Sequence, residues 1–149
     1  MAEALQHAEE ATAELRELAH GILPSVLTRG GLRAGVGALA SRMPVPIENR
    51  VAVDRLPVAV EATAYFIVAE ALTNATRHAN ATIVEIEVSA ADGTLSVEVR
   101  DDGIGGADPA GGGLRGLADR VAALDGTFEI STNRHGVGTT VRAVLPCVW

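Results

Sequence analysis

The sequence predicts an α/β protein in the broad sense, and more narrowly one of the α+β class. It is expected to be a two-layer sandwich, in which helices cover one face of a sheet. Segments that alternate apolar and polar residues predict four strands, at 84–88, 95–99, 128–130 and 141–145. They form two pairs, each joined by a turn, so both pairs are expected to be antiparallel hairpins. Helical patterns precede them. Such hairpins exclude a doubly wound parallel sheet.

The composition indicates one globular domain of 149 residues, 48% of them hydrophobic. A net charge of −7 disfavours a nucleic-acid partner, since phosphate binding needs a basic face. The single cysteine cannot form an internal disulfide, which fits a reducing, cytoplasmic compartment. No apolar run has membrane-spanning length and no signal peptide opens the chain, so no membrane contact is expected. All twelve basic residues are arginine, and the lack of lysine excludes a Walker A loop or a protein-kinase site.

The first half of the chain is predicted to be mainly helical. Residues 2–20 have a polar helical pattern, which indicates an excised or truncated piece, and Pro24 marks a break after it. Residues 25–42 predict a second helix that is weakened by four glycines. A short strand is expected at Glu48–Val53.

A third helix is expected from Pro57, which suits a first helical turn, to about Ala79. Its apolar stripe is made by Tyr65, Val68 and Leu72. Steps of four residues place Glu70, Asn74 and His78 on a different face, with a drift of about 80° over two turns. The sequence therefore predicts a helix with one packed side and one chemical side.

The second predicted strand ends in a carboxylate that should point into the core. Asp92-Gly93 is the expected turn before it, and Asp101 shares the parity of the apolar positions 95, 97 and 99. After a glycine-rich loop at 102–112, a helix is expected at Leu114–Leu124, with Gly126 as its C-terminal stop. Thr139 shares the inward parity of the last strand.

A buried Asp101 needs a partner, and a purine amine is a suitable one because an ionised carboxylate only accepts hydrogen bonds. Gly103 and Gly105 would let the chain turn sharply and let a base lie close. An ordinary turn before glycines is the alternative explanation of Asp101 and Asp102. An inward Thr139 hydroxyl beside Asp101 could share the base or a bridging water.

The chemical side of the long helix carries groups that suit a magnesium nucleotide. An amide oxygen from Asn74 fits Mg²⁺, which takes one or two protein ligands and substrate phosphates. Glu70 could hold a metal-bound water or act as a general base. Arg77 and His78 could meet phosphates. For a lone Glu–Asn pair, solvated helix residues are the more ordinary explanation.

A second glycine motif follows, and it literally matches the dinucleotide fingerprint Gly-x-Gly-x-x-Gly. A loop precedes it and a hairpin follows, so a Rossmann site is rejected. The glycine loop enters a helix, where free N–H groups and the helix dipole offer an anion site. The candidate residues of this motif are Gly111, Gly113, Leu114, Arg115 and Gly116.

Taken in order, these motifs resemble the N box, the two glycine boxes and the final Gly-Thr box of the GHKL ATPase superfamily, over roughly residues 57–146. Residues 14–18, 23–27 and 31–32 resemble the end of the dimerisation helices and the linker in sensor histidine kinases of the nitrate-sensor and desaturase-sensor type. The resemblance implies a Bergerat-type fold with a mixed, mostly antiparallel sheet. Residues 1–22 would then be the end of the dimerisation helix and linker, and 23–149 the catalytic and ATP-binding domain.

The resemblance also implies the roles of the site residues. Asp101 would bind the adenine amine, Asn74 would coordinate Mg²⁺, and Glu70 would orient or activate the reacting group. Arg77, His78 and residues 111–116 would contact phosphates. The partners implied are ATP, a response regulator and the dimerisation domain of the same kinase, on the cytoplasmic side of a membrane-anchored sensor or in the cytoplasm.

One departure from the family pattern concerns the phosphorylated histidine, which in these kinases precedes an acidic residue. None of the four histidines, at positions 7, 20, 78 and 135, does so. The phosphoacceptor is therefore expected outside this chain. Two other functions stay open: an anti-sigma-factor serine kinase of the same superfamily, and a non-catalytic ATP-binding or dimerisation module.

Overall fold

The computed structural model describes residues 23–104, 112–132 and 138–147. The helices and strands are α2 (Ser25–Ser41), β1 (Ile47–Ala52), α3 (Val58–Thr73), η1 (Asn74–His78), β2 (Val84–Ala91), β3 (Thr94–Asp101), α4 (Gly112–Ala123), β4 (Thr127–Thr132) and β5 (Thr139–Pro146). The expected helix at 2–20 lies outside the described residues. None of the described helices is long and apolar enough to cross a bilayer.

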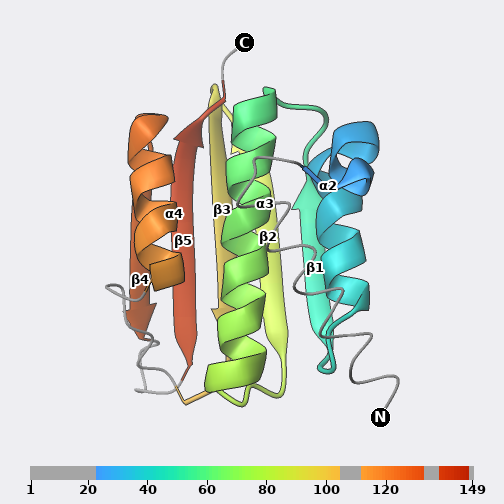
Figure 1. Ribbon diagram of the computed structural model, residues 1–149, viewed down its shortest axis with the longest axis vertical. Coiled ribbons are helices and arrows are strands. Elements are labelled where there is room, and N and C mark those ends of the chain that lie inside the picture. The colour runs from blue at the N-terminus through green and yellow to red at the C-terminus, as the bar shows by residue number, and fades with distance from the viewer. Residues whose placement is uncertain (1–22, 105–111, 133–137, 148–149) are drawn as a thin grey trace.

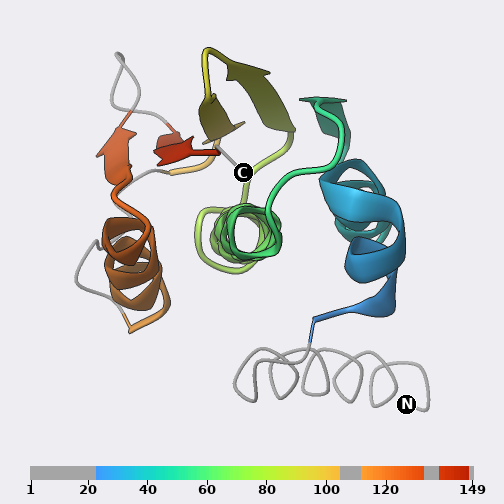
Figure 2. The ribbon, with the colours of Figure 1, turned by 90° about the horizontal axis from the view of Figure 1, so that it is seen from above.

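The strands form one sheet in the order β1–β2–β3–β5–β4 (Figure 1). Within the described part, β1 pairs with β2 in parallel and the other neighbours pair antiparallel. Seen from above, α2, α3 and α4 all lie on the same side of the sheet (Figure 2). The predicted fold class, a mostly antiparallel sheet with helices on one face, is confirmed.

The core lies between the sheet and the helices, and strand alternation decides which side chains enter it. Leu95, Val97 and Val99 on β3 are buried, as the parity argument predicted. The opposite face of the sheet is charged, and Arg100 there forms ion pairs with Glu85 at 3.1 Å and with Glu98 at 3.3 Å. An exposed charged face and an apolar inner face are what a two-layer domain requires.

The long helix departs from the prediction in three ways. Pro57 precedes the helix as its N-cap, and the first helical residue is Val58. The predicted stripe of Tyr65, Val68 and Leu72 is buried, but burial extends beyond it over most of the circumference of α3 and includes Glu61 and Thr63. Its last turn is a π-helix, in which the Ala79 N–H donates to the Asn74 carbonyl at 3.0 Å. One residue more per turn changes the direction of the helix face where the candidate residues lie.

The helix predicted at 25–42 is present but is interrupted. Gly31 has φ 79° and ψ −170°, a backbone conformation that essentially only glycine adopts, so α2 is two helical pieces joined at a kink. Gly31 lies against an ion pair in which Arg55 Nε is 3.2 Å from Oε2 of the buried Glu61. The two Nη atoms of Arg55 donate to the carbonyls of Thr28 and Arg29, which end the first helical piece.

Two turns fix the ends of the sheet. Asp92 (φ 54°) and Gly93 (φ 74°) form the two-residue turn predicted between β2 and β3. At the end of α4 the left-handed residue is Asp125, with φ 61°, and Gly126, the predicted C-terminal stop, follows it. The N–H of Gly126 still donates to the Val121 carbonyl, which closes the helix. Gly126 is needed for another reason, because a Cβ there would lie 2.5 Å from the Val144 carbonyl oxygen.

Candidate functional site

The carboxylate of Asp101 lies at the inward-facing end of β3, where only 8% of the residue is exposed. Its Oδ1 accepts the N–H of Gly103 at 2.9 Å, and the backbone N–H of Thr139 also donates to it. Burial raises the pKa of Asp101, and these two hydrogen bonds partly offset that increase. An inward-facing, buried acid was predicted, and its position is confirmed.

Thr139, the first residue of β5, pairs directly with Asp101 across the two strands. It is 5% exposed, so its inward parity is also confirmed. Gly138 before it has φ 86°, which allows the tight entry into the strand. The rest of the predicted turn, 133–137, lies outside the described residues. Asp101 and Thr139 together form a polar pair at the edge of an otherwise apolar core.

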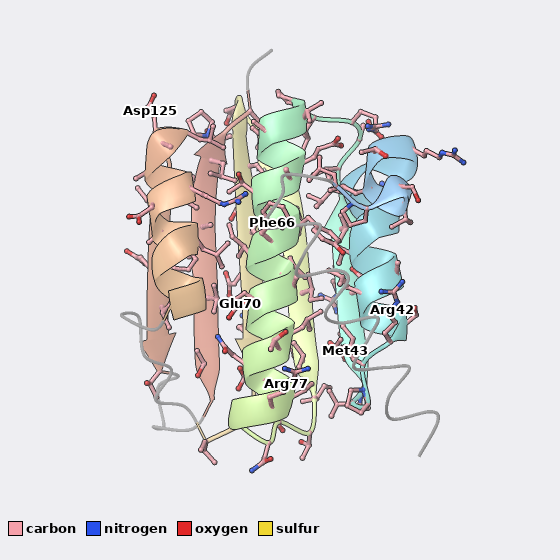
Figure 3. All side chains as sticks on the ribbon, viewed as in Figure 1. Arg42, Met43, Phe66, Glu70, Arg77 and Asp125 are labelled. Atoms are coloured by element: carbon pink, nitrogen blue, oxygen red, sulfur yellow. The ribbon has the colours of Figure 1, made fainter. Side chains whose placement is uncertain are left out.

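The candidate residues of the helix lie at the same end of the molecule as Asp101. In Figure 1 the end of β3, the start of β5, the end of α3 with η1 and the start of α4 converge at the lower end of the view. Glu70 and Asn74 are half-buried and Arg77 is exposed; Figure 3 labels Glu70 and Arg77 in the lower half of this helix. Among the described side chains, neither Glu70 nor Asn74 has a hydrogen-bond or ion-pair partner. Both can therefore contact a ligand. His78 is the last residue of η1.

Direct contacts join the strand end to the helix end. The N–H of Ile104 donates to the Ala79 carbonyl at 2.9 Å, and the Ala79 N–H donates to the Asn74 carbonyl. A Cβ on Gly103 would lie 2.4 Å from Ala79 Cβ, so glycine is required here for packing. The predicted role of Gly103 was space for a base, whereas its contact with Ala79 already explains the glycine. The Asp101 loop and the Asn74 helix therefore form one connected unit.

The second glycine motif is only partly described. Gly105 and Gly111 lie outside the described residues. Gly113, Leu114 and Arg115 belong to the first turn of α4, which begins two residues earlier than predicted. Gly116 is exposed, and a Cβ there would meet no described atom within 4 Å. Unlike Gly103, Gly116 is not required by packing against the described residues.

The chemistry of these residues fits Mg-ATP. Among the described residues there is no cluster of three or more metal-binding side chains. Mg²⁺ does not need one, because one amide or carboxylate oxygen, nucleotide phosphates and waters complete its coordination. Asn74 and Glu70 are the described side chains that suit that role, while Asp101 and Thr139 suit the purine. The free N–H groups at the start of α4 suit phosphate.

Two interactions were not identified from the sequence. Arg120 on α4 lies over the ring of Phe66 on α3, with its guanidinium carbon 4.6 Å from the ring centroid, and so joins the two helices. Asp102 binds the segment that follows η1. The position of Asp102 next to Asp101 was visible, but its hydrogen bonds depend on which residues the fold brings opposite it.

Comparison with known proteins agrees with the geometry. Residues 59–148 match the model of the histidine kinase-, DNA gyrase B- and HSP90-like ATPase family. The chain belongs to this ATPase family, as the four motifs predicted.

Its relatives include sensor kinases. The sensor histidine kinase MctS of Rhizobium johnstonii is 29% identical over 91% of this chain and 32% of its own length. The oxygen sensor histidine kinase NreB of Staphylococcus carnosus is 35% identical over 58% of this chain and 26% of its own length. The chain thus spans about a third or less of the length of these relatives.

Solved structures share the fold. The histidine kinase domain of the blue-light activated kinase from Erythrobacter litoralis EL346 matches with a TM-score of 0.63 and 24% identity, over 85% of this chain and 62% of that one. The ATP-binding domain of PrrB from Mycobacterium tuberculosis matches with a TM-score of 0.62 and 20% identity, over 79% of this chain and 92% of that one. The fold is therefore that of histidine kinase ATP-binding domains.

Proposed function

We propose that this domain binds Mg-ATP and transfers its γ-phosphoryl group to a histidine outside this chain, from which a response regulator receives it. The observation that carries the proposal is the buried Asp101 paired with Thr139, at the end of a strand after which Ile104 hydrogen-bonds Ala79 at the end of the helix of Glu70 and Asn74. The domain would work on the cytoplasmic side, where ATP is available. Residues 1–22 would be the end of the dimerisation helix and the linker, and the dimerisation domain would supply the acceptor histidine.

Each side chain has a distinct task in this proposal. Asp101 accepts a hydrogen bond from the adenine amine, and Thr139 shares the base or a water. Asn74 would hold Mg²⁺, with Glu70 reaching it through a water, and the bound ion would neutralise phosphate charge during transfer. Arg77, His78 and the first turn of α4 would hold the phosphates. Glu70 alternatively orients the acceptor imidazole or takes its proton. In the transfer, the bond between the γ-phosphorus and the β-phosphate oxygen breaks, and a bond between the γ-phosphorus and the imidazole nitrogen forms.

Two other functions remain to be separated from this one. An anti-sigma-factor serine kinase of the same superfamily would use the same residues to phosphorylate a serine hydroxyl of a protein substrate. A non-catalytic module would keep the fold without transfer. The named relatives reported above are sensor histidine kinases, and this supports the first function.

Nucleotide titration tests the binding step. Asp101→Asn presents an amide to the adenine amine and is expected to weaken ATP binding roughly 10- to 100-fold, as the loss of a buried acceptor does. Asp92→Asn, a change of the same kind in the distant β2–β3 turn, is the matched control and should bind as the native protein. Equal affinities for all three proteins by calorimetry would remove Asp101 from the site.

The transfer step needs a second experiment. The domain is mixed with Mg-ATP labelled in the γ position and a separate dimerisation domain that carries the acceptor histidine. Acid-labile label on that domain is expected, and Glu70→Gln should reduce its rate while nucleotide affinity changes little. Tight ATP binding without any labelled histidine would favour the non-catalytic module, and label on a serine would favour the serine kinase.

A further inference from the structure

Asp102 lies next to Asp101 but serves a different segment. Strand alternation turns it away from the core, and it is exposed. Its Oδ1 accepts the N–H groups of Thr82 at 2.7 Å and of Ile83 at 3.0 Å, and the Thr82 hydroxyl donates to its Oδ2. These bonds lower the pKa of Asp102, that from the Thr82 hydroxyl most of all. An exposed carboxylate with three donors from one segment acts as an anchor.

The segment that Asp102 holds is the connection between η1 and β2. It leaves the helix through Ala79 and Asn80, and Asn80 has φ 52°. The Ala81 N–H donates back to the Ala75 carbonyl at 3.0 Å, so the start of the connection is bound to η1 itself. Its other end, Thr82 and Ile83, is bound to Asp102. One end of the connection is therefore bound to the helix that carries Asn74, and the other end is bound to Asp102 at the end of β3.

The same two segments meet at a second place. Beyond Asp102, the Ile104 N–H donates to the Ala79 carbonyl, and Gly103 packs on Ala79 without room for a Cβ. Asp102 and Ile104, which precede and follow Gly103 in the chain, therefore both hydrogen-bond to the connection after η1. Two attachment points fix an orientation, whereas one would leave a hinge.

We infer that Asp102 is a positioning residue that fixes the adenine acceptor Asp101 relative to the metal ligand Asn74. This inference rests on the proposed function, because both ends must hold the same nucleotide. Asp102 itself does not touch the nucleotide. It acts through Thr82 and Ile83, which continue from the helix that carries Asn74.

The test compares ATP affinity with and without Mg²⁺ in four proteins: native, Asp102→Ala, Asp102→Asn and Glu85→Ala. Glu85→Ala removes the same charge nearby, and its partner Arg100 lies on the open face of the sheet. Asp102→Ala is expected to reduce the gain in affinity that Mg²⁺ gives by about tenfold, as the loss of an outer partner of a metal ligand does. Asp102→Asn keeps an acceptor oxygen for the two N–H groups, and its amide can donate to the Thr82 hydroxyl oxygen. All three contacts are then retained, so Asp102→Asn should stay close to native, as should Glu85→Ala.

Each outcome decides the question. A native protein that binds no ATP overturns the proposed function before any variant is compared. If Asp102→Ala keeps the native Mg²⁺ gain, or loses affinity equally with and without Mg²⁺, Asp102 does not position the two ends. If Asp102→Ala is unfolded at the assay temperature, Thr82→Val decides, because it removes only the hydroxyl. A reduced Mg²⁺ gain in Thr82→Val supports the inference, and a native gain overturns it.

Discussion

Replacing Gly31 by alanine should destabilise the domain strongly, although the sequence places this residue in an ordinary helical stretch. Gly31 joins the two helical pieces of α2 with φ 79° and ψ −170°. This conformation is essentially restricted to glycine, and forcing a residue with a Cβ into such a region costs about 1–3 kcal/mol. The backbone penalty alone is therefore a large part of the stability of a small domain.

A steric penalty adds to the backbone penalty. A Cβ on Gly31 would lie 2.7 Å from Arg55 Cδ and 3.2 Å from Glu61 Oε2. The Arg55 side chain is 51% exposed and can move, but moving it disturbs its bonds to Glu61, Thr28 and Arg29. With about 1–2 kcal/mol for that ion pair and its hydrogen bonds, the expected total loss is about 2–5 kcal/mol.

Gly37 provides the matched control within the same helix. It has helical backbone, and a Cβ there would meet no described atom within 4 Å. Gly37→Ala should therefore stabilise the domain by about 0.5–1 kcal/mol through helix propensity. Urea unfolding followed by circular dichroism gives both free energies of unfolding. If Gly31→Ala proves as stable as the native protein, or shifts in the same direction as Gly37→Ala, the kink is not imposed by the backbone and this argument fails.

Three further changes test other parts of the fold. Glu61→Gln should lower the free energy of unfolding by about 2 kcal/mol, which is less than a fully buried pair would lose because Arg55 is half exposed; a thermal shift below 1 °C would contradict this. Asp125→Gly should raise the free energy of unfolding by about 0.5–1 kcal/mol, because glycine adopts the left-handed conformation at the end of α4 without strain. An unchanged urea midpoint would argue against that. Asp101→Asn should have a free energy of unfolding at pH 7 at least as large as that of the native protein, and any difference should vanish as the pH falls below the ordinary aspartate pKa. A variant less stable than the native protein at pH 7 would show that burying the charge costs little.

The elements that could be predicted are those that depend on local periodicity. The alternation along β3 predicted both the buried strand and the inward Asp101, because strand side chains alternate faces whatever their neighbours are. The Asp92-Gly93 pair predicted its turn because both positions require positive φ. The order of the motifs predicted the family, and the family model confirmed it. The roles of the individual site residues remain predictions.

The features that could not be predicted depend on contacts between distant segments. Nothing local distinguishes Gly31, which bends the chain against Arg55 and Glu61, from Gly37, which does not. The need for glycine at position 126 comes from its contact with β5, where a Cβ would lie 2.5 Å from the Val144 carbonyl oxygen. The π-turn after Thr73 and the anchor at Asp102 likewise need their partners to be in place.

The buried carboxylate of Asp101 links the stability of the domain to its proposed ligand. Its pKa is raised on folding, so the folded state holds the proton more tightly than the unfolded chain does. Stability is therefore lost as the pH rises from the ordinary aspartate pKa through the raised value, and the ionised group remains a net burden at neutral pH. An asparagine would avoid that burden while still accepting the Gly103 N–H. A purine amine donated to the carboxylate would offset it, so adenine nucleotide should raise the unfolding midpoint of the native domain more than that of Asp101→Asn. Equal midpoint shifts in the two proteins would show that the charge is retained for some other reason.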